Sequence, residues 1–440
     1  MKLMKQCLVL MGMVAINLSF GQSYVGYAVD NYSGIHGVIY NPANVVGMPL
    51  RTDINLTSAS VFGGSDYFGI NLSDIISSDG GFDFEEDAEK FPTNTNNFFF
   101  NIDVVGPSFM LNLTKKSSIG VISRLRGNLN INDINGELYE AVVDDFDVDE
   151  DFSFNSEHLN GTIHAWGEIG VAYGRILVDK PQHFLKGGVT LKYLMGAGSL
   201  FLSSPGLQGE YTASSETLVT QGQLNYGTSE GFDNDDVNFS NITSGVGLDL
   251  GFTYQWYDNA SVDSLPKYKQ PYKLKVGVSV TDIGSISYDD AKISRYDLNA
   301  SVSTANYEED VESFLEDNYD NIDINETATL QLPTALHLLV DYRLSKKWFV
   351  SAQADLSMTK KDSELSSSVI NTATVAPRLE TKWFSFYAPL SFRQYGDVSF
   401  GGGFRLGPLT VGSGSVFTNL LSESSKTTDV YVGLKIPIYR

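Results

Sequence analysis

Residues 246–256 read VGLDLGFTYQW, a stretch in which large apolar side chains alternate with small or polar ones. A period of two is the pattern of a pleated strand, because successive side chains point to opposite faces. One face of this strand is wholly apolar, and the other carries Asp249 among small residues. The same alternation recurs over residues 272–281 and 430–438. Segments of about ten residues with one apolar and one charged face predict a transmembrane β-barrel.

The first residues predict that the chain is exported. Residues 1–5 are basic, and residues 7–18 form an apolar stretch that is too short to span a bilayer and is followed by small residues suited to cleavage. We therefore expect residues 1–21 to be a signal peptide. Cys7, the only cysteine, would leave with it, so the mature chain would have no disulfide or thiol chemistry. Export combined with strands predicts a place in the cell outer membrane, with outer-membrane lipid and lipopolysaccharide as neighbours.

The charge of the chain is strongly negative. The formal net charge is −23 at pH 7, which argues against nucleic acid as a partner. The acidic residues are clustered, and clusters of like charge predict solvated loops. They occupy residues 83–89, 144–151, 230–236 and 308–323.

The spacing of the strands predicts their connections. We expect strands near residues 117–128, 161–177, 184–196, 244–257, 271–281, 333–344, 348–358, 371–380, 382–392, 398–407, 409–417 and 428–438. Short connections then alternate with long ones at 129–160, 197–243 and 282–332. Barrels of this class have short periplasmic turns and long external loops, and the chain end falls on the periplasmic side. A short amphipathic helix is expected at 305–318 in the longest loop.

The first third of the chain leaves the strand count open. Gly106-Pro107 marks either a turn or a bulge in one long strand. With a turn, 97–104 and 107–114 complete 14 strands; with a bulge, 66–73 completes them and 54–62 joins a plug. Sixteen strands result if both hairpins enter the wall. The predicted fold is therefore an all-β transmembrane antiparallel barrel of about 14 strands, between 12 and 16, with an N-terminal plug and long acidic external loops.

Charged residues on the parity opposite the apolar face are expected to point into the lumen or to lie at strand ends. Charge on the lipid face would cost about 2–4 kcal/mol at the bilayer midplane. We expect mutually paired charges that fill a narrow lumen, and the alternative is that some of them line a substrate path. The candidates are Glu168, Lys186, Lys192, Asp249, Lys273, Lys275, Asp341, Arg343 and Arg405.

Other motifs predict no chemistry. The alternating aspartates of residues 145–151 lack the glycine and the distal glutamate of a calcium loop, so a solvated acidic loop is expected, with weak divalent-ion contact as the alternative. His164 and Glu168 share a strand face, but no third metal ligand is evident. No nucleophile elbow or catalytic triad is recognisable. We expect no enzyme, no metal and no cofactor.

The segment before the first strand resembles a known one. It is rich in glycine, asparagine and tyrosine and contains Tyr40-Asn41-Pro42-Ala43-Asn44. Asn41-Pro42-Ala43 resembles the N-terminal hatch motif of the FadL/TodX fatty-acid transporters and of the related PorV proteins of type IX secretion. This resemblance implies a plug over residues 22–52 that closes a 14-stranded barrel over 53–440. Displacement of the plug would open a route for hydrophobic ligands.

Shorter stretches carry the same resemblance along the chain. Residues 332–336 with 347–348 resemble the late hairpin of FadL-type barrels, and 247–251 with 277–284 resemble the central strands of PorV-like proteins. The whole chain, ending in the strand at 429–435, resembles an uncharacterised Bacteroidota family of such barrels. It departs from them in ending on arginine after a penultimate tyrosine, and in a lumen more charged than a fatty-acid path suggests.

Two functions follow as hypotheses. The first is a barrel that passes or holds a hydrophobic or amphiphilic small molecule, with the plug as gate. In this hypothesis Pro42 fixes a tight turn, and Asn41 hydrogen-bonds local backbone to seal the lumen. The second is a non-transporting barrel that serves as membrane anchor or accessory of a type IX-like secretion or surface complex. Its acidic loops would then bind the proteins of that complex.

Overall fold

The computed structural model describes residues 24–71, 88–229, 232–233, 236–237, 243–258, 272–307, 310–361, 363–396 and 398–440. The expected signal peptide lies outside these residues, as do most of the acidic clusters at 83–89 and 230–236. Across the described ranges, every helix is too short or too polar to cross a bilayer.

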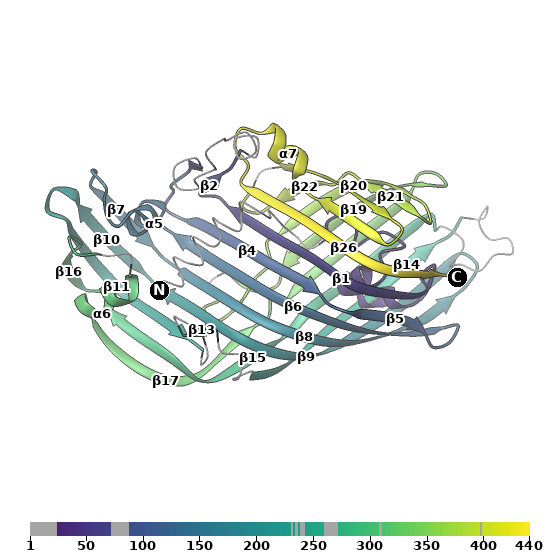
Figure 1. Ribbon diagram of the computed structural model, residues 1–440, viewed down its shortest axis with the longest axis horizontal. Coiled ribbons are helices and arrows are strands. Elements are labelled where there is room, and N and C mark those ends of the chain that lie inside the picture. The colour runs from purple at the N-terminus through teal and green to yellow at the C-terminus, as the bar shows by residue number, and fades with distance from the viewer. Residues whose placement is uncertain are drawn as a thin grey trace.

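In the described part of the chain, fourteen antiparallel strands close into a barrel (Figure 1). Each strand pairs with the next along the chain, and β26 closes on β1. Closure leaves no open edge in the wall, which a structure in lipid requires. The wall consists of β1 (Leu50–Ser65), β4 (Asn96–Val105) continued by β5 (Ser108–Asn112), β6 (Ser117–Ile134), β8 (Leu159–Asp179), β9 (His183–Ser204), β14 (Thr243–Trp256), β15 (Leu274–Asp297), β18 (Ala335–Arg343), β19 (Trp348–Ser357), β20 (Thr372–Glu380), β21 (Phe384–Tyr387) continued by β22 (Leu390–Arg393), β23 (Val398–Phe400) continued by β24 (Gly402–Leu406), β25 (Leu409–Ser413) and β26 (Thr427–Tyr439).

The outer face of this wall is apolar. In β14, Asp249 and Thr253 are buried on the lumen side, whereas Val246 and Phe252 keep 74% and 51% of their surface exposed. The same contrast runs along β26, where Lys435 is buried and its neighbour Ile436 is exposed. A continuous exposed apolar surface of this kind is unfavourable in water and matches the lipid-facing band of a membrane barrel. The predicted fold class is confirmed.

The N-terminal strands resolve the alternatives left open by the sequence. β4 and β5 share the same two neighbours, β1 and β6, so Gly106-Pro107 is a bulge in one strand and the turn alternative is wrong. The strand that completes the count is β1, not 66–73, and 54–62 belongs to the wall and not to the plug. A register shift between Asn55 and Thr57 reverses the parity of the buried residues in β1, which hides its alternation in the sequence.

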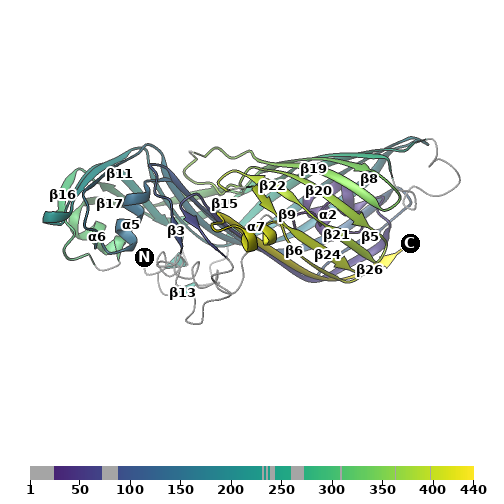
Figure 2. The ribbon, with the colours of Figure 1, turned by 90° about the horizontal axis from the view of Figure 1, so that it is seen from above.

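The plug precedes β1 and comprises residues 24–49. It contains α2 (Ile35–Tyr40) and the 3₁₀ turn η1 (Pro42–Val45), and most of its side chains are buried. Figure 2 shows α2 inside the barrel, at the end where the chain terminates and the short turns lie. We take this end as periplasmic. β1 begins at Leu50, three residues before the boundary of 53 expected from the sequence.

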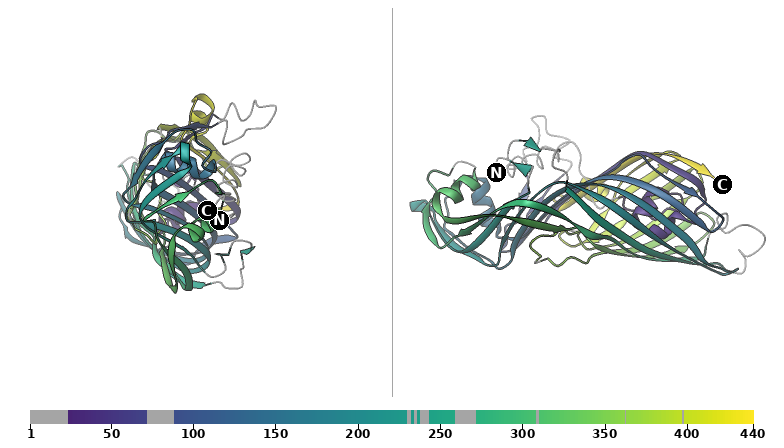
Figure 3. Two further views of the ribbon diagram at one scale, coloured as in Figure 1. Left: turned by 90° about the vertical axis from the view of Figure 1, so that its left-hand side faces the viewer. Right: turned by 90° about the horizontal axis from the view of Figure 1, so that it is seen from below.

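Beyond the opposite rim, several strands continue into an outer extension (Figure 3). The three long connections expected as loops therefore contain regular structure. The helix expected at 305–318 is present as α6, which begins later than expected, at Val311. The outer extension comprises the upper parts of β6, β8, β9 and β15 together with α5 (Gly136–Val143), β7 (Phe152–Ser156), β10 (Leu207–Thr212), η2 (Ala213–Ser215), β11 (Thr217–Thr228), β16 (Ala300–Ser303), α6 (Val311–Asn318) and β17 (Asp320–Gln331). Smaller elements at the rim are β2 (Phe68–Gly69), β3 (Glu89–Lys90), β12 (Phe232–Asp233), β13 (Asp236–Val237) and α7 (Val416–Leu421).

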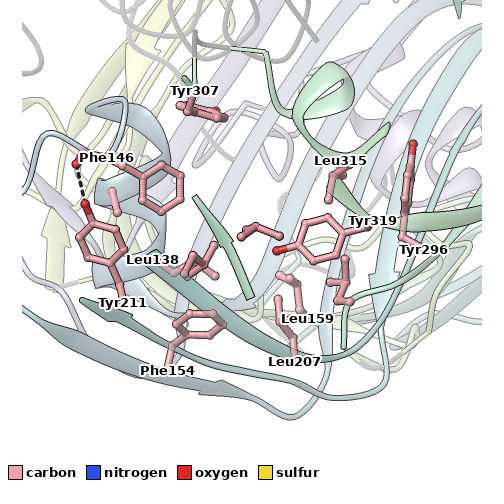
Figure 4. Close-up of a cluster of buried hydrophobic side chains, with 14 of the residues drawn as sticks. Leu138, Phe146, Phe154, Leu159, Leu207, Tyr211, Tyr296, Tyr307, Leu315 and Tyr319 are labelled. Atoms are coloured by element: carbon pink, nitrogen blue, oxygen red, sulfur yellow. Dashed lines mark hydrogen bonds between the residues drawn. The ribbon is translucent and has the colours of Figure 1, made fainter. Parts of the chain in front are cut away.

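An apolar core of its own holds the outer extension together (Figure 4). Leu138 from α5 and Leu315 from α6 are buried among aromatic side chains of the surrounding strands. Tyr211 donates a hydrogen bond to the carbonyl oxygen of Phe146 at 3.1 Å, which satisfies its buried hydroxyl. Side-chain caps begin both helices, since Asn135 accepts from Leu138 N in α5 and an aspartate caps α6.

Candidate functional site

The Asn41-Pro42-Ala43 turn contacts both itself and the wall. Asn41 has extended backbone, and its Oδ1 accepts a hydrogen bond from Ala43 N at 3.0 Å, so it caps η1 while Pro42 occupies the first position. The Nδ2 group of Asn41 donates to the carbonyl oxygens of Phe252 at 3.1 Å and Val278 at 3.2 Å. These carbonyls belong to the neighbouring strands β14 and β15. One side chain thus fixes the turn and fastens it to two strands.

The wall beneath this turn carries glycines in register. Gly174, Gly188 and Gly251 lie directly opposite one another across β8, β9 and β14, and we call them the glycine seat. A Cβ atom at Gly188 would collide with the backbone of Pro42, and one at Gly251 would collide with the Asn41 side chain. The plug approaches the wall so closely there that any side chain would displace it.

Ionic contacts tether the rest of the plug to the last strands of the barrel. The carboxylate of Asp30 pairs with Arg405 Nε at 3.1 Å and accepts a hydrogen bond from Tyr387 Oη at 2.5 Å, and both charged groups are buried. Asp53 of β1 pairs with Lys435 of β26 at 3.1 Å across the seam where the barrel closes. The same Asp53 accepts from the first amide of α2 at 3.0 Å.

A second set of tethers lies beside the first. Asn31 of the plug donates to Glu380 at 2.8 Å, and Glu380 pairs with Arg378 at 2.8 Å. Arg378 pairs in turn with Asp341 at 2.8 Å, and Lys275 lies 3.4 Å from the same carboxylate while donating to a plug carbonyl. Lys186 donates to the carbonyl oxygen of residue 46 at 3.0 Å. The periplasmic half of the lumen is therefore filled by the plug and the charges that hold it.

A further cluster of buried charges, the outer network, lies on the external side of the plug. It contains three cations and four carboxylates, all of them buried. Arg124 pairs with Asp103 at 2.9 Å and with Glu168 at 2.8 Å. Arg126 pairs with Asp282 at 2.9 Å, and Lys192 pairs with Asp249 at 2.8 Å and with Asp282 at 2.6 Å. Arg126 and Lys192 also each lie 3.8 Å from Glu168. Unequal numbers of cations and carboxylates leave this part of the lumen acidic.

The lumen candidates from the sequence separate into groups. Glu168, Lys192 and Asp249 belong to the outer network, and the tethers include Lys186, Lys275, Asp341 and Arg405. Lys273 and Arg343 lie apart from both groups, at strand ends beside the periplasmic turns. Lys273 donates to the carbonyl oxygen of Arg343 at 3.1 Å, and Arg343 lies 3.4 Å from Asp258.

Several residues of the site were not anticipated. Arg124 and Arg126 alternate with apolar neighbours in an expected strand, and Asp103 has the parity opposite to Ile102, so the parity rule would have found them. Asp30 carries no such signal because it lies in an irregular segment.

The histidine and aspartate motifs from which no metal site is expected make ordinary packing contacts and hydrogen bonds. His164 packs on Trp166 with ring centroids 4.7 Å apart, and its Nε2 lies 3.1 Å from Tyr288 Oη. Asp151 accepts a hydrogen bond from Ala213 N at 2.8 Å. Among the described residues, no group of three histidine, cysteine or acidic side chains has the geometry to hold a metal ion.

A cavity of about 130 Å³ lies between the plug and residues 363–370. We call residues 363–370 the outer strap. The outer strap folds inward, where Ser368 N donates to Asn130 Oδ1 at 3.0 Å. Gln353 Nε2, at the cavity wall, has no hydrogen-bond partner among the described residues. The lining combines apolar groups with members of the outer network: Val25, Ala28, Ile39, Phe62, Phe99, Val369 and Ile370 with Arg124, Arg126, Lys192 and Asp282.

Fold and site together define a transmembrane β-barrel closed by an N-terminal plug. The chain belongs to a family of unknown function, DUF5723, which matches residues 42–414. No curated protein matches the chain.

Several solved outer-membrane barrels are similar to the chain at low identity. The Ralstonia pickettii toluene transporter TbuX is 10% identical with a TM-score of 0.44, over 93% of this chain and 95% of that one. A Pseudomonas aeruginosa FadL homologue is 10% identical with a TM-score of 0.44, over 94% and 96%. The Pseudomonas putida toluene transporter TodX is 10% identical with a TM-score of 0.39, over 96% of each chain.

Proposed function

We propose that the chain is an outer-membrane barrel that takes up a hydrophobic or amphiphilic ligand through a lumen gated by its N-terminal plug. The observation that carries this proposal is the cavity between the plug and the outer strap. Its lining pairs aliphatic and aromatic side chains with charged ones, which suits a ligand that has an apolar body and a polar end. The apolar outer face of the barrel supports a location in the outer membrane.

The contacts of the plug support movement as the gating step. Asn41, Asn31 and Asp30 all bind the wall through hydrogen bonds or ion pairs, and water can replace such contacts when the plug moves. Wall side chains do not interlock with the turn at the glycine seat, because the seat presents backbone only. The Asn41-Pro42-Ala43 turn can therefore leave the seat without a rearrangement of the wall.

The test uses two adjacent glycines that face opposite sides of β9. In Gly188→Ala the new methyl group collides with the backbone of Pro42, so the plug must shift. In the control Gly187→Ala the methyl group meets only the side chains of Phe252 and Leu177 on the lipid side. We expect Gly188→Ala to raise single-channel conductance and uptake of a fluorescent fatty acid by at least threefold, and the control to leave both unchanged. Equal conductance and uptake in the two variants would overturn plug gating.

We propose partner recognition as a second function, which the outer extension favours. A sheet with its own apolar core and two capped helices is more structure than a transport path needs. Its surface is rich in carboxylates, as in residues 144–151. Affinity capture with the full chain from native outer membranes tests this function. Recovery of secretion or surface-complex proteins would support it, and recovery of lipid alone would oppose it.

A further inference from the structure

β17 is the last strand of the sheet in the outer extension, and it is paired on one side only. It pairs with β15 from Asp320 to Gln331, and in the described part of the chain no strand runs along its other edge. At its lower end Gln331 bridges to Ser366 of the outer strap. In Figure 1, β17 runs along the lower outline of the outer extension. An edge of this kind leaves a row of backbone N–H and C=O groups without strand partners.

The strand at the other end of this sheet is different. β7 (Phe152–Ser156) has five residues and packs beside α5, whereas β17 has twelve. Proteins commonly keep edge strands short or covered, because a long open edge templates pairing with another chain. The length and exposure of β17 therefore need an explanation.

Core contacts hold both ends of β17 in place. Tyr319, directly before the strand, is buried and accepts a hydrogen bond from Thr220 Oγ1 at 3.0 Å. Ala328 and Leu330, near its other end, are fully buried. The edge is thus rigid before anything binds it, which lowers the entropy lost on binding.

The side chains of β17 select the chemistry of a partner. Asp320, Asp323 and Glu326 are exposed along the strand, and Ile322 among them keeps 67% of its surface exposed. The basic groups beside them are Arg295, which pairs with Glu326 at 3.0 Å, and Lys292 on β15. A second copy of the chain pairing here would bring carboxylates opposite carboxylates, which is unfavourable.

We propose that β17 is a docking strand for an extended segment of a partner protein that carries lysine or arginine at every third position, the spacing of Asp320, Asp323 and Glu326. The segment adds to the sheet as a new strand next to β17. Its backbone pairs with the open edge, its cations meet the carboxylates, and its apolar residues cover Ile322. This inference rests on the second proposed function, partner recognition, and is independent of transport.

The test uses the full chain in lipid nanodiscs and a ten-residue peptide that has lysine at every third position with valine and threonine between. We expect saturable binding by fluorescence anisotropy, with slowed hydrogen exchange at the backbone amides of residues 320–330. The variant Asp320→Asn/Asp323→Asn/Glu326→Gln should weaken binding at least tenfold, because it removes the charges and keeps the shapes. The matched control Asp147→Asn/Asp149→Asn/Glu150→Gln makes the same change of charge on exposed residues elsewhere in the outer extension and should bind as the unmodified chain does.

A second peptide separates strand addition from charge attraction. It has the same sequence but is N-methylated at alternate residues, so it keeps its charge and loses the donors that pair with an edge strand. At least tenfold weaker binding is expected. Equal binding of the two peptides, equal loss in the two triple variants, or exchange protection outside β17 would each overturn the inference. If the β17 variant still captures the same membrane proteins as the unmodified chain, this inference fails while partner recognition stands.

Discussion

β15 runs through both the barrel and the outer extension, and its buried face changes character between them. In the barrel the buried residues include Lys275 and Ser279, whereas above the rim they include Ile286 and Ile293. The outward residues change in the opposite sense, from Val276 in the barrel to charged and polar groups above it. Lipid surrounds one half of the strand and water the other. Alternation therefore identifies the strand, and the polarity of the buried face identifies its solvent.

The change occurs at an irregularity of the backbone. Asp282 has a φ of 60°, in the left-handed region that few residues with side chains adopt, and Gly284 follows with a φ of 159°. The carboxylate of Asp282 joins the outer network. The point where the wall leaves the lipid is thus also the point where the outer network closes the lumen.

Of the three changes considered, breaking a tether in the charged lumen should have the largest effect. Arg405→Ala leaves Asp30 buried without its cation, which costs about 3–5 kcal/mol. We expect the plug to become accessible to protease and the conductance to rise. The strands of the wall should remain paired, including β26 with β1. The control Arg295→Ala breaks an ion pair whose side chains are half exposed, and its effect on the free energy of unfolding should stay below about 1 kcal/mol. Equal effects of the two variants would mean that burial in the lumen adds nothing to the ion pair.

A cavity in the apolar core tests the other region. Leu315→Ala removes a buried side chain of α6 and should cost about 2–5 kcal/mol within the outer extension. Hydrogen exchange should speed up in β11 and β16, while the strands of the barrel keep their protection. If the barrel loses protection together with the outer extension, the two regions form one cooperative unit and the contrast between them is wrong.

The smallest effect is expected at the start of α6. Partial burial acts to raise the pKa of Asp310, but hydrogen bonds from Ser313 outweigh it, so that the pKa is lowered. A carboxyl group whose pKa is lowered by folding stabilises above its unfolded pKa of about 3.9, and this contribution is lost as the pH falls through the lower folded value. Asp310→Ala should cost about 1 kcal/mol near neutral pH. The protection factors of the α6 amides should fall in acid in the unmodified chain and should not change with acid in the variant.

Much of the barrel could be predicted because lipid imposes a strict rule on the strands that it contacts. The alternation of β14 and the lumen-facing positions of Asp249 and Lys192 follow from parity alone. β1 was placed in the wall by only one of the alternatives, because its bulge at Asn55 reverses the parity. β17 was not predicted as a strand. Most of its residues are exposed on both faces, so it shows no alternation.

The site was less accessible to sequence reasoning than the wall. Asn41-Pro42-Ala43 was recognisable as a motif, but its seat was not. Gly174 and Gly188 are two of 41 glycines in the chain, and only the pairing register brings them together beneath the turn. Their role depends on tertiary placement, which local pattern does not encode.

The tethers of the plug also constrain how the protein is assembled. Val25 and Tyr32 accept hydrogen bonds from Tyr431 and Lys435, so the earliest part of the folded chain binds its final strand. Lys435 in turn pairs across the seam with β1. These bonds cannot form until the last strand has been synthesised and lies beside the plug. The contacts of the plug are therefore completed late in folding, with the strand that closes the barrel.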